Sequence, residues 1–425
     1  MTKPSSPRQR PHVRLSDVPP LVHRIGQRAF SGHEILDEYA GTVGLLLWIL
    51  YRDAELWSTA VNRTQLFHRD GPDHWHDAIR DLAAPVYAEI KPSLTILADL
   101  ARAEAPNDVT VASACETIAG WSEQQNRLGT AVEYAQVASF AQPDRAMHAV
   151  RAARVLRIRA EYERAVTWFD HAIIVARKTC DWEAYAQAYS GLGCLFIQRG
   201  NYRRARVVLK RSLRTALRHS LPERVGAACH NLFSVEAVTE NWVLAEQYAD
   251  QALANYLPGS RGLPRLARDL AFRWLQRGYF ERALPLSCEV LRHFSAPADR
   301  ALIWSDIARA AAGCGQVETF EDAWAQAYAL TKQDHTEPFT VDILLNLAYA
   351  AAFRRDVVRG SMTAQRAAEL ARQRKQGTVV LEAEGVLSSL NAAASPVLRP
   401  QQAGEAIPGI ASRFVEVLER VRATV

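Results

Sequence analysis

Hydrophobic side chains recur along most of the chain with the spacing of one face of an α-helix. From about residue 31 onward, apolar positions three and four residues apart are separated by charged and polar ones. No alternating apolar and polar stretch of useful length is present. Spacings of three and four residues are typical of amphipathic helices, whereas strands alternate with a period of two. The sequence therefore predicts a nearly all-α protein.

The clearest unit of this pattern is a predicted helix pair between residues 192 and 212. The first helix carries Gly193, a turn follows at 199–201, and Tyr202 begins a second helix that carries Ala205. Small residues allow two helix axes to approach to about 8–10 Å where they cross. We therefore expect two antiparallel helices packed at Gly193 and Ala205.

This unit recurs along the chain. A small residue equivalent to Ala205 returns at intervals of 34 to 40 residues, at Ala131, Ala165, Ala205, Ala245, Ala283, Ala323 and Gly360. A second column twelve residues upstream is small in six of the seven units, and a third column seven residues downstream is small in five. Each pair alone buries one face, and stacking closes a continuous core. We therefore expect about seven stacked pairs within 107–395.

These columns resemble the tetratricopeptide repeat (TPR) family. The best matches are Tyr162–Ala165, Asn201–Ala205, Asn241–Ala245, Phe280–Ala283 and Phe320–Ala323. The period is nearer 40 than the family's 34 residues, and Leu128 and Val357 replace the expected aromatic residue in the first and last units. The resemblance implies an all-α, right-handed superhelical solenoid of antiparallel helix pairs. Its first helices would line a concave groove.

The ends of the chain differ from the repeats. Residues 1–30 are rich in Pro and Arg and predict a flexible basic arm. Residues 31–106 predict helices near 33–62, 74–88 and 92–104, interrupted at Gly71-Pro72 and Lys91-Pro92. They form either two degenerate repeats or a helical N-terminal cap, and we favour the cap because the first repeat must shield its apolar face.

Residues 396–425 predict a linker followed by one amphipathic helix, from Gly409 to Val425. Its apolar stripe comprises Ile410, Phe414, Val417, Leu418, Val421 and Val425. Such a helix either covers the last repeat or serves as a ligand for a partner. We favour a cap over the last repeat.

The charge is weakly basic, with 51 Lys and Arg against 46 Asp and Glu and a net charge of +5. The densest basic segment comprises Arg203, Arg204, Arg206, Lys210, Arg211, Arg214 and Arg218. Family resemblance places this second helix on the convex outside, where a solvated face is the simplest interpretation. Phosphate binding is the alternative, although no aromatic residues are interleaved for base stacking.

No apolar run reaches the roughly 18 residues of a membrane span, and no secretory signal follows the basic N-terminus. The six cysteines, with no CxxC pair, are Cys115, Cys180, Cys194, Cys229, Cys288 and Cys314. Scattered cysteines at apolar helix positions favour reduced thiols, without disulfides or zinc. We therefore expect a cytoplasmic protein.

Catalytic motifs are missing from the sequence: it has no P-loop, GxGxxG after a strand, HExxH or GxSxG. Adjacent Cys229 and His230 point about 100° apart on a helix and form no dyad. The cluster of His68, His74 and His76 among aspartates matches no standard metal-ligand spacing, and a solvated loop is favoured. We expect neither an enzyme nor a cofactor or metal protein.

The TPR resemblance also assigns the groove. Its register implies partner-binding positions at Arg154, Arg157, Gln187, Gln198, His230, Asn231, Arg265, Arg268, Arg309 and Tyr349. Aligned arginines suit carboxylates, so we expect a protein or acidic peptide partner. Pairing of these arginines with neighbouring carboxylates is equally compatible with the sequence. The match to chaperone-binding TPR clamps is partial, because Ser190 and Cys194 stand where Lys and Asn are expected.

The sequence thus predicts a cytoplasmic, non-catalytic adaptor or regulatory scaffold. Two alternatives stay open. The first is a nucleic-acid-associated protein that uses the basic stripe, and the second is a peptide-sensing regulator that lacks a DNA-binding domain of its own. The sequence leaves the oligomeric state undetermined.

Overall fold

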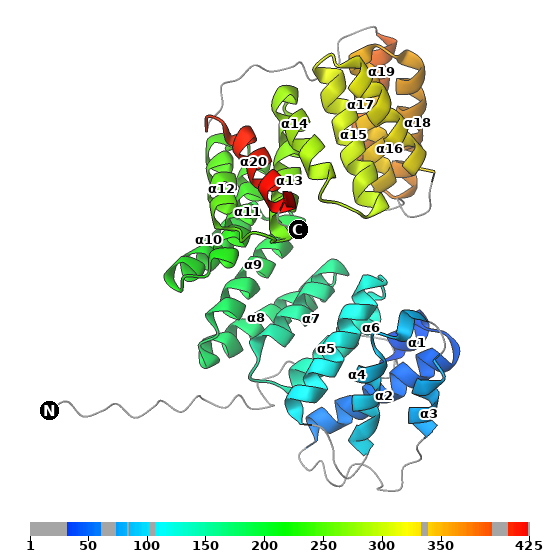
Figure 1. Ribbon diagram of the computed structural model, residues 1–425, viewed down its shortest axis with the longest axis vertical. Helices are drawn as coiled ribbons and strands as arrows, with labels where there is room; N and C mark the ends of the chain where they lie inside the picture. Colours follow the sequence, from blue (N-terminus) through cyan, green and yellow to red (C-terminus); the bar gives the residue numbers. More distant parts are fainter. Residues whose placement is uncertain are drawn as a thin grey trace, which may run out of the picture. The chain divides into compact units, whose positions relative to one another are not determined.

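The computed structural model describes residues 32–60, 74–82, 85–101, 107–332, 339–392 and 407–423. These residues form twenty α-helices and short 3-10 turns without a strand (Figure 1), which confirms the predicted all-α class. None of the helices in these ranges is long and apolar enough to cross a membrane. The chain divides into two compact units, Met1–Arg224 (unit 1) and Val225–Val425 (unit 2).

Four helices precede the repeats in unit 1. They are α1 (His33–Glu38), α2 (Gly41–Thr59), α3 (His74–Arg80) and α4 (Lys91–Ala98). The helix predicted near 33–62 is broken because Tyr39 and Ala40 are extended and Gly41 has a φ of 66°. The segments predicted at 74–88 and 92–104 contain shorter helices, followed by 3-10 turns at Pro85–Tyr87 and Asp99–Ala101.

Seven successive helix pairs follow. In unit 1 they are α5 (Asp108–Gln124) with α6 (Leu128–Ala141), α7 (Ala146–Ile158) with α8 (Tyr162–Thr179), and α9 (Trp182–Gln198) with α10 (Tyr202–Arg218). Helix α11 (Pro222–Val238) begins at the end of unit 1 and is followed by α12 (Trp242–Asn255). Unit 2 continues with α13 (Gly262–Gln276) and α14 (Phe280–Leu291), α15 (Pro297–Gly313) and α16 (Val317–Leu330), α17 (Thr340–Arg354) and α18 (Val357–Gln373), and ends with α19 (Gly377–Asn391) and α20 (Ile410–Ala423).

The N-terminal helices cover the first pair. The carboxylate of Glu38 accepts the backbone N–H groups of Gly129 and Thr130, both at 2.7 Å, and so caps the N-terminus of α6. From α6, Tyr134 donates its hydroxyl to the carbonyl of Leu47 at 2.7 Å. Helices α1 and α2 thereby shield a face of α6 that an array would otherwise expose.

The turn within each pair has one conformation. A residue with positive φ stands two positions before each second helix, at Asn126, Ala160, Gly200, Glu240, Gly278, Gly315 and Arg355. The residue after it donates its N–H to a carbonyl five positions earlier, as Asn201 does to Phe196 at 2.8 Å. This is the Schellman closure of a helix C-terminus. It fixes where every second helix can begin.

These turns correct the predicted register of the sixth pair. Because Gly315 adopts a φ of 74°, α16 begins at Val317, three residues before Phe320. Phe320 is therefore not the turn aromatic, and Ala323 is not the counterpart of Ala205. Phe320 is fully buried, with its ring centroid 5.7 Å from that of Trp324.

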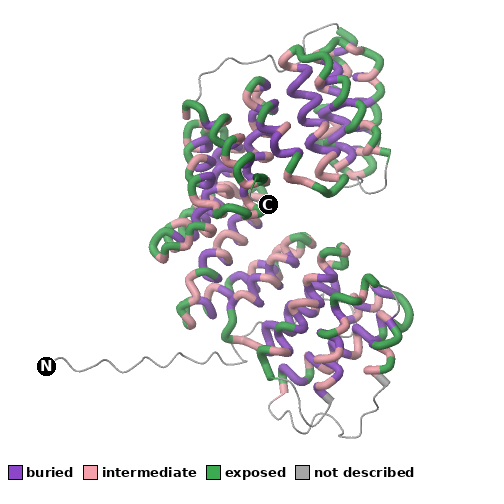
Figure 2. Tube along the Cα trace, viewed as in Figure 1, coloured by how far each residue is buried: buried purple, intermediate pink, exposed green. Residues whose placement is uncertain are grey.

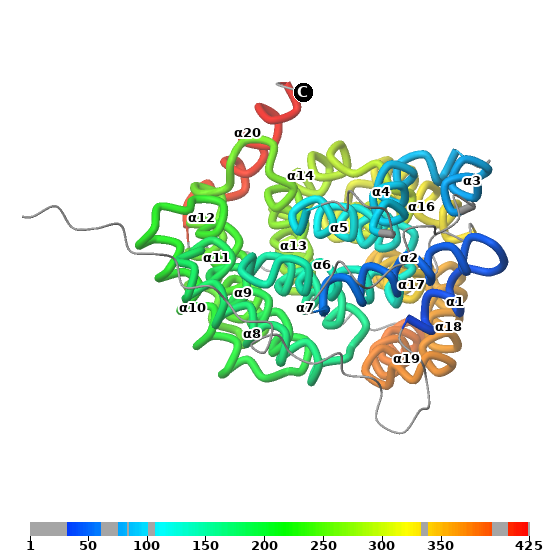
Figure 3. The backbone as a smooth tube through the Cα atoms, turned by 90° about the horizontal axis from the view of Figure 1, so that it is seen from below, coloured from blue at the N-terminus to red at the C-terminus, as the bar shows by residue number. Residues whose placement is uncertain are grey.

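Buried positions follow the helix contacts (Figure 2), and the crossing residues Ala165, Ala205 and Ala283 are fully buried. The C-terminal helix departs from the sequence expectation. Helix α20 lies against α13 and α14 (Figures 1 and 3) instead of covering the last repeat. In the sequence, residues 392–409 stand between α19 and α20.

Candidate functional site

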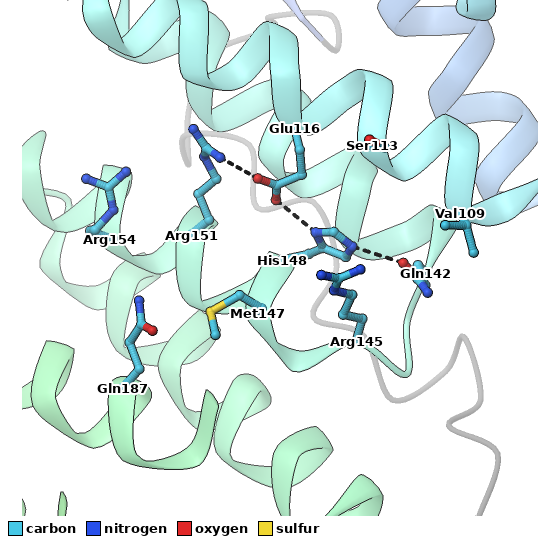
Figure 4. A pocket seen from close by; sticks show the side chains of 10 residues that line it. All are labelled: Val109, Ser113, Glu116, Gln142, Arg145, Met147, His148, Arg151, Arg154 and Gln187. Atoms are coloured by element: carbon cyan, nitrogen blue, oxygen red, sulfur yellow. Dashed lines mark hydrogen bonds and ion pairs between the residues drawn. The ribbon is translucent and has the colours of Figure 1, made fainter. Parts of the chain in front are cut away.

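Unit 1 contains an open pocket of about 460 Å³ on its first helices (Figure 4). Its lining residues come from α5, α7, α9 and the segment before α7: Val109, Ser113, Glu116, Gln142, Arg145, Met147, His148, Arg151, Arg154 and Gln187. We call this site the arginine pocket. Three consecutive pairs contribute to it, so its shape depends on the stacking of the array.

Helix α7 supplies the pocket's basic side through regular spacing. His148, Arg151 and Arg154 are three residues apart and share one helix face. The opposite face places Ala149, Ala153 and Leu156 in the core. Arg145 stands in the turn just before α7 and adds a third guanidinium from outside the helix.

Two of the three arginines are paired with carboxylates of α5. The Nη1 atom of Arg151 lies 2.5 Å from Glu116 Oε2, and Nη2 of Arg154 lies 2.5 Å from Glu123 Oε2. The side chain of Arg154 is nevertheless 40% exposed. Neutralisation is therefore local, and Arg154 retains donors that face solvent.

Glu116 holds the pocket together. Its Oε1 lies 2.8 Å from Nδ1 of His148, whose Nε2 lies 3.2 Å from Oε1 of Gln142. Burial by itself raises the pKa of Glu116, but the hydrogen bond from His148 and the charge of Arg151 outweigh it and the pKa is lowered. An ionised Glu116 thus fixes the orientation of both His148 and Arg151.

Arg145 is exposed, and the structure places no carboxylate within ion-pair distance of it among the described residues. The pocket therefore has three guanidinium groups against the carboxylates of Glu116 and Glu123. Gly120 on α5 makes room for this arrangement, because an added Cβ would lie 2.7 Å from Nη2 of Arg151. The surplus charge favours an anionic ligand.

Only Arg154 and Gln187 of the four groove residues predicted in unit 1 line this pocket. Arg157 is half-buried on α7, and its Nε has no hydrogen-bond partner among the described residues. Gln198 is exposed at the end of α9. The sequence reasoning missed Arg145, His148 and Arg151, although the three-residue spacing on α7 was a usable signal.

Unit 2 contains a second pocket, of about 360 Å³, lined by Phe233, Ser234, Arg268, Asp269, Phe272, Arg273, Leu302, Phe339 and Asp342. Of the predicted groove residues, only Arg268 lines it. Asn231 is half-buried on α11 and Arg265 is exposed on α13. Three phenylalanines line this pocket, and its two arginines are matched by two aspartates. It is therefore less basic than the arginine pocket.

His230 is held in a polar contact within unit 2. Its Nε2 lies 2.9 Å from Oδ2 of Asp269, and its Nδ1 lies 3.2 Å from the hydroxyl of Tyr256. Neighbouring Cys229 is buried and its Sγ lies 3.6 Å from Oε1 of Gln251. Burial raises the pKa of the Cys229 thiol to about 12. The thiol is therefore a protonated, packed group.

Arg309 lies in the interior of unit 2, whereas Tyr349 is half-buried and lines a separate pocket of about 310 Å³. Arg309 is 5% exposed and donates from Nη1 to Oδ1 of Asn346 at 3.0 Å. Asn346 in turn donates to Asp306 at 2.7 Å. Burial raises the pKa of Asp306 to about 7, although the charges of Arg268 and Arg309 lower it. Arg309 therefore belongs to a buried polar cluster and does not present its charge to a ligand.

The basic stripe lies on α10. Its exposed cations are Arg203, Arg204, Lys210, Arg211, Arg214 and Arg218, and the helix carries no acidic residue. The guanidinium of Arg211 lies 4.8 Å from the ring centroid of Tyr189 and 5.8 Å from that of Tyr185, both on α9. No aromatic residue is interleaved among these cations on α10, but the neighbouring helix places two rings beside Arg211.

No group of three His, Cys, Asp or Glu within the described ranges is arranged to hold a metal ion. His76 Nε2 lies 2.9 Å from Oδ1 of Asp99. His68 and the side chain of His74 fall outside the described residues. The predicted solvated loop therefore stays a prediction.

One segment of the chain matches a known family model. Residues 144–218, which span α7 to α10, match the family model described as tetratricopeptide repeat. No curated protein matches the chain.

Three solved structures are similar at low identity. BtubC (BKLC) from P. vanneervenii is 18% identical, covering 51% of this chain and 91% of its own, with a TM-score of 0.42. Pseudomonas aeruginosa pilF is 17% identical, covering 54% and 97%, with a TM-score of 0.39. The TPR2AB domain of yeast Sti1, in a complex with pHSP90, is 16% identical, covering 66% and 99%, with a TM-score of 0.28.

Proposed function

We propose that this chain, whose residues 144–218 match the tetratricopeptide repeat model, is a non-catalytic cytoplasmic adaptor that binds an acidic segment of a partner protein in the arginine pocket of unit 1. TPR arrays generally bind other proteins, but the fold alone does not select a partner. The chemistry of the pocket supplies that selection. All six cysteines are free thiols, which supports a reducing compartment.

The observation that carries the proposal is the convergence of Arg145, Arg151 and Arg154 in one open pocket. A guanidinium presents a planar fork of donors that matches a carboxylate. Glu116 and Glu123 fix Arg151 and Arg154 in place, so little side-chain freedom is lost when a ligand binds. Arg145 contributes a cation that no described carboxylate neutralises.

The remaining lining suits a peptide backbone. The side-chain amides of Gln142 and Gln187 can both donate and accept hydrogen bonds. Met147 offers a flexible apolar surface between them. A pocket of about 460 Å³ accommodates a short stretch of an extended chain. A partner would therefore insert one or two acidic side chains together with their backbone.

The test uses two fluorescein-labelled decapeptides, one alternating Glu with Gly and one alternating Gln with Gly. Fluorescence anisotropy should show tighter binding of the Glu peptide. Combining Arg145→Glu with Arg154→Glu should weaken that binding at least tenfold, roughly 1.4 kcal/mol. Arg151 stays unchanged because it is bonded to Glu116.

Arg203→Glu with Arg204→Glu is the matched control, since it reverses two exposed arginines of the same unit outside the pocket. It should leave the affinity for the Glu peptide within about twofold. Equal binding of both peptides, or an equal loss in both double variants, would contradict the proposal.

The α10 stripe supports a second candidate, a nucleic-acid-associated protein. The exposed cations Arg204, Arg211 and Arg218 are seven residues apart and extend over about 21 Å of helix. Cations in a row without carboxylates suit a phosphate backbone. A labelled single-stranded oligonucleotide should bind with strong salt dependence and be lost in a triple Glu variant at these positions. Retained binding in that variant would exclude α10 as the contact surface.

A further inference from the structure

The C-terminal helix occupies a surface that belongs to earlier helices. Helix α20 packs on α13 and α14 and reaches α12 through an ion pair between Arg413 and Asp250 at 2.8 Å. In a repeat array each helix normally packs on its neighbours in sequence. Helix α20 instead meets helices that precede α15 to α19 in the sequence.

Apolar contacts anchor this helix. Ile410, Phe414 and Leu418 lie four residues apart on one face and are each fully buried. The surface beneath them is correspondingly covered. Within the twelve residues of α14, only Glu281 and Pro285 are exposed, whereas α10, another second helix, exposes eight of its seventeen residues. The outer face of α14 is thus built to receive an additional helix.

Carboxylates mark both ends of the surface. At the N-terminal end of α20, Glu246 accepts the backbone N–H of Ile407 at 3.3 Å, where a helix dipole favours negative charge. At the other end, Glu289 lies 3.6 Å from Nη1 of Arg422. The side chains of Glu246 and Glu289 are only 5% and 4% exposed. These anchors fix the direction of the bound helix.

We propose that the face formed by α12, α13 and α14 is a binding site for an amphipathic helix of a partner protein, and that α20 is its occupant within the same chain. We call it the helix site. Its ligand carries large apolar side chains at positions i, i+4 and i+8, a cation at i+3 and another at i+12. This site is separate from the arginine pocket of unit 1 and does not depend on the proposed function there.

Because α20 belongs to the same chain as its site, its binding is intramolecular, and it competes with any partner helix at a high effective concentration. A partner helix must therefore exceed the affinity of α20 to displace it. In the free chain α20 therefore occupies the helix site. A partner helix with the same pattern of apolar and cationic positions displaces it only when it binds more tightly.

The test uses a fluorescein-labelled peptide of residues 405–425 and the full-length chain. Phe414→Asp with Leu418→Asp removes two buried contacts of α20 and leaves α12–α14 unchanged. The peptide should bind this variant at least tenfold more tightly than the wild type, in which α20 competes. A peptide that carries the same two substitutions should not bind. Equal affinity for the variant and the wild type would overturn the proposal.

Charge reversal tests the site itself. Asp250→Arg, added to the Phe414→Asp and Leu418→Asp variant (the released variant), should weaken binding of the peptide at least fivefold. A peptide with Arg413→Asp should recover the affinity. If the released variant does not fold, as shown by the loss of its thermal transition, the proposal is tested instead by hydrogen exchange of the wild type. Amides of α20 should then exchange faster than those of α13 and α14. Exchange of α20 only with global unfolding would show a permanent part of the core and refute the helix site.

Discussion

The guanidinium carbon of Arg309 lies 4.2 Å from the centroid of the Tyr349 ring. This stacking and the hydrogen bond to Asn346 offset part of the desolvation free energy of burying a cation in unit 2. Arg309→Ala should lower the free energy of unfolding by about 3 kcal/mol, because Asp306 and Asn346 lose a buried partner. Urea denaturation measures the change. Arg265→Ala, an exposed arginine of the same unit, should change it by less than about 0.5 kcal/mol.

Asp306 should make the stability of unit 2 depend on pH. Burial raises its pKa from 3.8 to about 7 in the folded chain. Between these pH values the folded chain binds a proton that the unfolded chain has released, so the free energy of unfolding falls as the pH rises. The contribution is fully present below about pH 4 and lost above about pH 7.

Asp306→Asn removes this titration and keeps an oxygen to accept from Asn346. Chemical denaturation at pH 4.5, 6 and 8 should show a smaller decline with pH for the variant, with a difference on the order of a few kcal/mol across the range. Parallel curves for the variant and the wild type would mean that Asp306 titrates in the same way when folded and unfolded.

Glu38 should couple the N-terminal helices to the first repeat. Glu38→Ala removes the acceptor of two backbone N–H groups at the start of α6 and should cost about 1–3 kcal/mol. Thermal denaturation followed by circular dichroism measures this loss. Asp37→Ala changes the exposed neighbour on the same helix. A similar loss in both variants would show that the effect comes from α1 itself and not from the cap.

Gly193 should tolerate no larger side chain. An added Cβ would lie 2.3 Å from Cδ2 of Leu209, which is fully buried. Gly193→Ala should therefore lower the free energy of unfolding by about 1–3 kcal/mol. Gly385→Ala is the control, since no atom lies within 4 Å of its added Cβ, and it should stabilise α19 by about 0.5–1 kcal/mol. Denaturant titration of both variants decides, and equal shifts would reject the close approach.

Local signals in the sequence were sufficient for the helices and their crossings. Small residues at Gly193, Ala205 and Ala283 identified buried crossings because any larger side chain there would overlap a neighbour. The predicted register of the sixth pair was wrong because Phe320 lies three residues further from the turn than its counterparts do. The backbone conformation of Gly315 sets that turn, and the aromatic residue used for alignment does not.

Polar contacts between distant segments were harder to predict from the sequence. The family register placed Arg154 and Arg309 in one class, yet one lines an open pocket and the other is buried. The difference depends on which neighbouring helix supplies Glu123 or Asn346, and spacing within one helix does not contain that information. The apolar stripe of α20 was visible in the sequence, but the helices that it covers were not.

The location of α20 has a consequence for the time course of synthesis. Roughly 130 residues separate the end of α14 at Leu291 from the end of α20 at Ala423. At about 5–20 residues per second, a ribosome needs on the order of ten seconds to produce them. During that interval, the nascent chain presents the apolar outer face of α14 to the surrounding cell. Factors that act on emerging chains therefore encounter this face before the chain's own terminus can cover it.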